Sequence, residues 1–239
     1  MKAHVRYRFG RALILALAAL LAPVPAWAQE QAPGDIPETG QDPLEGFNRA
    51  MFAVHEGIDL ALLKPAAQGY EAVVPLPARV GISNFYDNLW EISRSGNAFL
   101  QGKGQKGLTS LGRLLVNSTV GIFGLFDVAG KMGLEEGDED FDQTLAVWGV
   151  PGGPYIFLPL IGPSTMRGLA GWSLDQAAYP LWAQVNDHPA LRNGLVVLNV
   201  VKMRAALLPA DQVIEDAAFD KYTYIRSAYL QRRAAQIRD

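Results

Sequence analysis

The stretch from Val147 to Thr165, VWGVPGGPYIFLPLIGPST, restricts the fold more than any other part of the chain. It contains four prolines, four glycines and no charged residue, and the uncharged run extends from Gln143 to Met166. Because proline lacks a backbone N–H and clashes with the preceding helical turn, no long helix can form here, including one that crosses a bilayer. The stretch is also too apolar for an ordinary surface loop. We therefore expect an extended or hairpin segment.

The first 28 residues have the pattern of an export signal. Four basic residues lie between Lys2 and Arg11, an apolar segment follows from Ala12 to Ala22, and Ala26-Trp27-Ala28 has the form of a cleavage site. An uncleaved membrane anchor is the alternative, which the short apolar segment disfavours. We expect a signal peptide over residues 1–28 and export to a bacterial periplasm. The chain has 21 basic and 24 acidic residues, and residues 1–28 carry basic but no acidic residues, so the exported part is acidic and no nucleic-acid partner is expected.

The residue types that most catalytic and metal sites need are scarce. The chain has no cysteine, which excludes disulfides and a lipid-anchor cysteine. His55 and His188 are its only histidines after residue 28. No G-x-S-x-G motif is present, and Gly102–Gly107 matches G-x-G-x-x-G after a helical pattern, where a dinucleotide site needs a strand. We therefore expect neither an enzyme nor a bound cofactor.

An acidic segment raises the question of a metal site. Asp138, Asp140 and Asp142 have the spacing of the first ligands of a calcium-binding loop, but Gln143 and Gly149 occupy the positions where that loop needs glycine and glutamate. The expectation is a solvated acidic loop without a metal, and a weak surface calcium site is the alternative.

Helical periodicity covers most of the remaining chain. We expect a single, mostly α domain over residues 42–239, built from short amphipathic helices, after a disordered leader over residues 29–41. No later segment has 18 consecutive apolar residues, so no helix that crosses a bilayer is expected. The expected helices cover residues 42–62, 64–74, 78–101, 108–120, 141–148, 164–178, 189–208, 211–217 and 219–237.

Within residues 78–101, one or two helices are expected. Their apolar side chains should face the interior of the domain, as in a soluble protein. These side chains are Val80, Phe85, Leu89, Ile92 and Phe99.

Nine short motifs follow one another along the chain. They are DPLEGFNR (42–49), Lys64-Pro65, VGISNFYDNL (80–89), FLQG (99–102), RLLVN (113–117), GLFDVAG (124–130), FDQTLAVWG (141–149), GPYIFLPLIGP (153–163) and Tyr179-Pro180. Each motif alone is modest, but the ordered set resembles the VacJ/MlaA family of outer-membrane proteins over roughly residues 42–231.

The resemblance implies a function in outer-membrane lipid asymmetry. Members of that family form a helical, ring-like structure embedded in the membrane, with a channel that takes mislocalised phospholipid from the outer leaflet. They pass this phospholipid to the periplasmic carrier MlaC and associate with an outer-membrane porin trimer. They have no catalytic residues and use no cofactor. The resemblance thus implies that this chain lies in the bacterial outer membrane on its periplasmic side.

The chain departs from the family pattern at two places. The best-known members carry a lipidated cysteine after the signal, where this chain has Ala28-Gln29. In addition, Phe52–His55, with the sequence FAVH, replaces an F-N-F-N-like stretch of the first helix. The first departure affects how the protein is anchored, and the second affects the resting state of the channel.

A lipid channel needs polar groups for the headgroup beside apolar walls for the acyl chains. We expect such a lining from polar side chains interleaved with apolar ones and from the proline-rich segment. The candidate residues are Asn84, Asn88, Asn117, Ser118, Thr119, Phe123, Tyr155, Phe157, Leu158 and Leu160. The alternative is that the polar residues are helix caps or buried hydrogen-bonding groups, and that the proline-rich segment is a buried connector.

Two functions remain open from the sequence. One is a lipid-transfer channel, and the other is a porin-associated structural envelope protein without transport activity. The direction of lipid flow, the headgroup preference and the identity of the porin do not follow from the residues.

Overall fold

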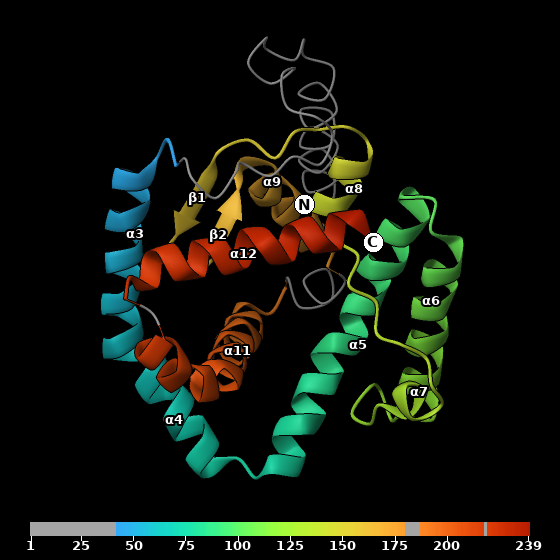
Figure 1. The fold of residues 1–239 in the computed structure, drawn as a ribbon. Helices are drawn as coiled ribbons and strands as arrows, with labels where there is room; N and C mark the ends of the chain where they lie inside the picture. Colours follow the sequence, from blue (N-terminus) through green and yellow to red (C-terminus); the bar gives the residue numbers. More distant parts are fainter. Residues whose placement is uncertain (1–41, 180–186, 218) are drawn as a thin grey trace. The chain divides into compact units, whose positions relative to one another are not determined.

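A computed structural model describes residues 42–179, 187–217 and 219–239 (Figure 1). The expected signal peptide and disordered leader lie outside these residues. The fold is mostly α, as predicted. Its elements are α3 (Glu45–Ile58), a π-helical turn (Asp59–Leu63), α4 (Lys64–Val73), α5 (Leu76–Leu100), α6 (Gly104–Thr119), α7 (Val128–Lys131), α8 (Phe141–Val147), β1 (Tyr155–Leu158), β2 (Gly162–Thr165), α9 (Met166–Ala178), α11 (Pro189–Ala217) and α12 (Lys221–Arg238).

The first helix begins three residues later than predicted. Asp42 lies ahead of it and accepts the Leu44 backbone N–H at 3.0 Å, so its side chain organises the turn that leads into α3. Lys64-Pro65 does not end the helical path, because the π-helical turn over Asp59–Leu63 precedes it and α4 continues to Val73. Proline has no backbone N–H, and a π-helical turn just before Pro65 lets the helical path continue without that hydrogen bond.

The prediction that five apolar side chains of α5 face the interior was wrong for three of them, while Phe85 and Leu89 are half-buried. Val80, Ile92 and Phe99 are exposed, whereas polar residues of the same helix are buried. The neighbouring α6 also exposes apolar side chains, namely Leu108, Leu111 and Leu115. The two helices pack side by side (Figure 1). Their buried polar residues are Asn88, Glu91, Ser95, Asn97, Ser110, Arg113 and Asn117.

A buried ion pair joins α5 to α6, the two helices that bury polar side chains and expose apolar ones. Arg113 Nε lies 2.7 Å from Glu91 Oε1, and both side chains are buried. The Arg113 guanidinium also donates to the Leu134 carbonyl at 2.6 Å and to Asp127 at 3.2 Å. These bonds compensate the Arg113 guanidinium and one oxygen of Glu91, whereas Glu91 Oε2 is buried without a hydrogen-bond partner among the described residues. Several apolar residues of both helices are left on the outside.

The proline-rich segment is a β-hairpin, as one of the two predicted conformations. β1 and β2 pair antiparallel, with Tyr155 opposite Thr165 and Leu158 opposite Gly162. In the turn between them, Leu160 has a φ of 69°, a left-handed conformation that a leucine rarely adopts. The hairpin buries Tyr155 and Phe157 in a small core with Phe52, Tyr222 and Leu230.

Side-chain caps mark the later helices. Thr165, one residue after the start of the predicted helix 164–178, caps α9 by accepting the Gly168 N–H at 3.0 Å. Asp220 caps α12 by accepting the backbone N–H groups of Tyr222 and Thr223. Both caps follow the ordinary preference for short oxygen-bearing side chains at this position.

α11 unites two predicted helices into one, with Pro209 inside it. It packs against α4, and Arg204 binds Asp59 at 2.6 Å and Asp211 at 2.8 Å. By length and composition, Pro189–Glu215 is long and apolar enough to cross a bilayer, and few of its side chains are buried. The prediction that no helix crosses a bilayer stays a prediction. Length and composition alone do not place it in a membrane.

Candidate functional site

A polar hollow of about 560 Å³ lies between six parts of the fold. Its lining combines charged groups with indole and aliphatic side chains. The lining residues are Asp87, Trp90, Ser93 and Arg94 from α5; residues 138–140 before α8 and Asp142 in it; Ile161, Pro163 and Ser164 from the hairpin; Gly168, Trp172 and Asp175 from α9; Asn199, Lys202 and Met203 from α11; and Tyr229, Arg232, Arg233 and Gln236 from α12. We refer to this space as the polar hollow.

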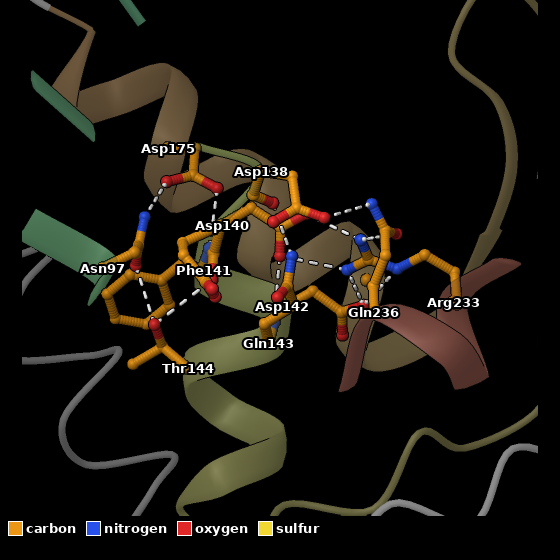
Figure 2. A network of polar contacts seen from close by, with 12 residues as sticks. Asn97, Asp138, Asp140, Phe141, Asp142, Gln143, Thr144, Asp175, Arg233 and Gln236 are labelled. Carbon is orange, nitrogen blue, oxygen red and sulfur yellow. Dashed lines mark hydrogen bonds and ion pairs between the residues drawn. The ribbon is translucent and has the colours of Figure 1, made fainter. Parts of the chain in front are cut away.

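A hydrogen-bonded network forms one wall of the polar hollow, around the start of α8 (Figure 2). Asp175 on α9 accepts the Phe141 backbone N–H and the Asn97 side-chain amide, each at 2.9 Å. Asn97 in turn accepts the Thr144 hydroxyl at 2.8 Å. Burial raises the pKa of Asp175 above its ordinary value, although these donors act in the opposite direction. The network thus fixes α5, α8 and α9 to one another.

The carboxylates at the start of α8 bind arginines (Figure 2). Asp142 is bound by Arg167 at 2.6 Å and by Arg233, and Arg233 also binds Asp140 at 2.8 Å. Two members of the candidate calcium loop are therefore neutralised by guanidinium groups. The structure favours neither a calcium loop nor a freely solvated acidic loop at these positions.

A second acidic cluster is also neutralised by cations. Carboxylate oxygens of Asp138, Glu139 and Asp239 lie within 4.8 Å of one another. Glu139 is buried and is bound by Lys103 and Lys106, each at 3.0 Å. With two ammonium groups on its buried member, this cluster is an ion-pair network that fixes the segment before α8 to α6.

Another part of the lining of the polar hollow, with Asp87 and Lys202, joins α5 to α11. The Tyr86 hydroxyl donates to the Leu195 carbonyl at 2.8 Å, and the Lys202 ammonium lies 5.1 Å from the centre of the Tyr86 ring. The Lys202 Nζ atom is 4.0 Å from Asp87 Oδ1. This wall therefore holds a mostly buried cation with a carboxylate near it but beyond hydrogen-bond distance.

The predicted channel residues on α5 and α6 gather at one end of the helix pair. Asn88 donates to the Ser118 hydroxyl at 2.9 Å, and Asn84 donates to the Leu125 carbonyl at 3.1 Å. Asn117 donates to Asp127 at 2.9 Å and accepts the Ala129 N–H at 2.8 Å. These amides tie down the turn after α6, which is what the alternative interpretation expected of them.

The remaining predicted residues divide between surface and core. Thr119 donates to the carbonyl of Leu115 in its own helix, and Phe123 is 77% exposed. Leu158 is half-buried and Leu160 is exposed, whereas Tyr155 and Phe157 belong to the core under the hairpin. None of the ten predicted channel residues lines the polar hollow.

The lining of the polar hollow gives little signal in the sequence. Its charged residues come from five separate segments and have no common spacing. Lys202 alone gives a local hint, because it interrupts the apolar run of α11 between Val201 and Met203. A lysine within an apolar stretch of a helix is a candidate functional residue, although none of the nine motifs contains it.

An apolar groove lies outside the polar hollow. It has a volume of about 890 Å³ and runs between the start of α5 and the segment around α7. Leu76, Val80, Leu125 and Phe126 contribute to its lining, and Asn84 is the predicted channel residue that borders it. An acyl chain has the shape and polarity that such a groove accepts.

Comparison with known proteins gives a consistent result. The model of the MlaA lipoprotein family matches residues 40–236. The intermembrane phospholipid transport system lipoproteins MlaA of Shigella flexneri and of Escherichia coli are 37% and 36% identical, each over 80% of this chain and 76% of the relative. A solved structure that concerns maintenance of bacterial outer membrane lipid asymmetry aligns with a TM-score of 0.72 at 36% identity, over 82% of this chain and 99% of the other. The chain therefore belongs to the MlaA lipoprotein family.

Proposed function

We propose that this protein is the outer-membrane component of an intermembrane phospholipid transport system. In this role it takes mislocalised phospholipid from the outer leaflet and passes it to a periplasmic carrier. The observation that carries the proposal is the combination of outward-facing apolar side chains on α5 and α6 with the polar hollow beside them. The names of its relatives, which are components of such a system, support the same role.

Each half of this combination suits one part of a phospholipid. Exposed leucines and phenylalanines on α5 and α6 are unfavourable in water and stable against acyl chains. A headgroup that leaves water needs hydrogen-bond donors and charges, which the polar hollow provides. A path with both features lowers the cost of moving a lipid out of its leaflet.

The remaining parts of the proposal concern the setting of the protein. We place it in the outer membrane, in a ring-like structure beside a porin trimer, with the periplasmic carrier MlaC as the recipient of lipid. It acts without catalysis. Although its relatives are named lipoproteins, this chain has no cysteine to carry a lipid, so its apolar helix faces would hold it in the membrane.

Matched tryptophan variants in the host bacterium test this function. Asn199→Trp fills the polar hollow from α11, whereas Asn193→Trp adds the same side chain at an exposed position of the same helix. Strains that lack the gene are complemented with either variant. Outer-leaflet phosphatidylethanolamine is then measured in intact cells with an amine reagent that does not cross the membrane, and protein level is measured by immunoblotting.

The proposed function predicts that deletion raises outer-leaflet phospholipid. Asn193→Trp should restore the normal level, and Asn199→Trp should fail to do so at equal protein abundance. A purely structural envelope protein predicts the opposite, with both variants restoring the barrier. Normal lipid asymmetry in the deletion strain would overturn the transport proposal.

A further inference from the structure

The polar hollow contains one weakly compensated pair of opposite charges. Lys202 Nζ on α11 and Asp87 Oδ1 on α5 are 4.0 Å apart, which is beyond hydrogen-bond distance. The Lys202 side chain is 12% exposed and that of Asp87 is 41% exposed. Water therefore reaches the carboxylate more readily than the ammonium.

The other basic residues of the lining are either bound more tightly or exposed. Arg233 is held by Asp140 and Asp142, and Arg94 lies 2.8 Å from Glu136. Arg232 is exposed to solvent. Among the described lining residues, Lys202 thus differs from the arginines: its side chain is mostly buried, and no carboxylate lies within hydrogen-bond distance of it.

Its surroundings leave Lys202 able to bind an anion. The Tyr86 ring at 5.1 Å provides a cation–π contact, but it accepts no hydrogen bond of ordinary strength from the ammonium. Asp87 uses Oδ2 to accept the Ser83 hydroxyl at 3.3 Å, so Oδ1 remains available for another donor. The pair therefore offers one cationic and one anionic position, side by side.

We propose that Lys202 and Asp87 form a recognition site for a zwitterionic, amine-bearing phospholipid headgroup. The phosphodiester binds the Lys202 ammonium, and the headgroup ammonium binds the Asp87 carboxylate. This inference rests on the proposed function and adds a headgroup preference to it. Both contacts are charge-assisted hydrogen bonds, which are stronger than bonds between neutral groups.

An anionic headgroup without an amine fits the same pair less well. Phosphoglycerol offers Lys202 a phosphate, but it meets Asp87 only with neutral hydroxyls and adds net negative charge beside a carboxylate. A zwitterionic headgroup instead leaves both protein charges compensated. The two headgroup types differ by one charge-assisted contact. At a partly hydrated site this corresponds to binding of the zwitterionic headgroup that is about threefold to tenfold tighter.

Native mass spectrometry of the full chain tests the preference. The protein is released from nanodiscs that contain equal amounts of phosphatidylethanolamine and phosphatidylglycerol, and bound lipids are identified by mass. Wild type is compared with Asp87→Asn, Lys202→Gln and, as a control, Arg238→Gln, which alters an exposed cation at the end of α12 outside the polar hollow and the apolar groove. Circular dichroism verifies that each variant is folded.

We expect phosphatidylethanolamine to be enriched about threefold to tenfold on wild type and on Arg238→Gln. Asp87→Asn should retain lipid and lose the enrichment, whereas Lys202→Gln should lower the amount of either lipid bound. Bound lipid in the same ratio as the bilayer, or enrichment that persists in Asp87→Asn, would overturn the headgroup inference and leave lipid transport standing. Folded wild type that releases no bound lipid would overturn both.

Discussion

Asn48 on α3 and Phe157 on β1 are 109 residues apart in the chain, and the Asn48 side-chain carbonyl accepts the Phe157 backbone N–H at 2.8 Å. The same carboxamide donates to the Tyr155 carbonyl at 3.1 Å and to the Asp42 carboxylate. Asn48 thus satisfies backbone groups at the edge of β1 that would otherwise be buried without partners. One side chain of the DPLEGFNR motif therefore holds the hairpin against the first helix.

Replacing Asn48 by alanine should destabilise the protein. The change leaves the buried Phe157 N–H and Tyr155 carbonyl unpaired, which costs about 1–3 kcal/mol in the free energy of unfolding. Chemical denaturation in detergent measures this loss. Gln105→Ala, at an exposed position of α6, is the control and should change stability by less than about 0.5 kcal/mol. Equal stability of the Asn48 variant and wild type would mean that water replaces the carboxamide.

Secondary structure followed from local sequence to a large extent. The predicted limits of α8 and α9 agree with the structure to within two residues, although the side chains that cap them are Asp140 and Thr165, which the sequence analysis did not identify as caps. The hairpin was one of two conformations that prolines allow in the uncharged segment. These features depend on neighbouring residues, which is why the sequence alone could predict them.

The burial of α5 could not be predicted in the same way. Periodicity separates an apolar face, with Val80 and Ile92, from a polar face, with Asn88 and Glu91, but it does not say which face meets the solvent. The assumption of an aqueous exterior gave the wrong answer. Arg113 lies 22 residues from Glu91, and only the packing of α6 on α5 makes the polar face the buried one.

The polar hollow was beyond prediction for a related reason. Its lining assembles residues such as Asp87, Asp175 and Lys202, which lie far apart in the chain, and only Asp87 of these belongs to one of the nine motifs. Several motif residues instead have structural positions, as Asn48 and Asn117 show. Short-range patterns thus identified the parts that hold the fold together, and the cavity between those parts required the three-dimensional arrangement.

The buried ion pair between Arg167 and Asp142 provides a second test of stability. The two side chains are almost completely buried, and Arg167 also donates to the Val150 carbonyl at 2.8 Å. Arg167→Met should cost about 3–5 kcal/mol, because it removes one partner and leaves a buried carboxylate with less compensation. A double-mutant cycle with Asp142→Asn, followed by chemical denaturation, measures the coupling. Additive effects of the two substitutions would contradict a direct interaction.

Phe123 allows membrane association to be separated from folding. It is 77% exposed and has a φ of 56°, a conformation that aspartate tolerates better than phenylalanine. Phe123→Asp should therefore fold normally in detergent and lose affinity for membranes, as measured by flotation with phospholipid vesicles. Phe157→Asp, in the core under the hairpin, is the contrasting variant and should fail to fold. Unchanged flotation of Phe123→Asp would show that this turn faces water.

The prolines that flank β1 test whether the hairpin affects lipid passage. Replacing Pro154 and Pro159 together by glycine increases the conformational freedom of the unfolded chain and should lower stability by about 1 kcal/mol per site. If the hairpin borders the lipid path, lipid asymmetry should change more than protein abundance. Detergent sensitivity of the host reports asymmetry, and immunoblotting reports abundance. A normal barrier at normal abundance would make the segment a connector.

His55 should make the tip of the hairpin sensitive to pH. Its Nδ1 atom accepts the Leu160 backbone N–H at 3.3 Å, so the bond exists only while this nitrogen is unprotonated. Burial lowers the pKa of His55 below its ordinary value, Arg204 lowers it further, and Asp59 and Glu56 act against them. Because the folded-state pKa is the lower one, this contribution to stability is complete above about pH 6.5 and is lost as the pH falls through the folded-state pKa.

Hydrogen exchange at the Leu160 amide measures this effect. Exchange rates are corrected for their intrinsic dependence on pH, and protection at about pH 7.5 is compared with protection at about pH 5. Protection should fall at the lower pH in wild type, because the protonated imidazole no longer accepts the bond and repels the donor. His55→Leu removes the titrating group and should give low protection at both values. Equal protection of wild type at both values would show that the turn is held by its own conformation and not by the bond to His55.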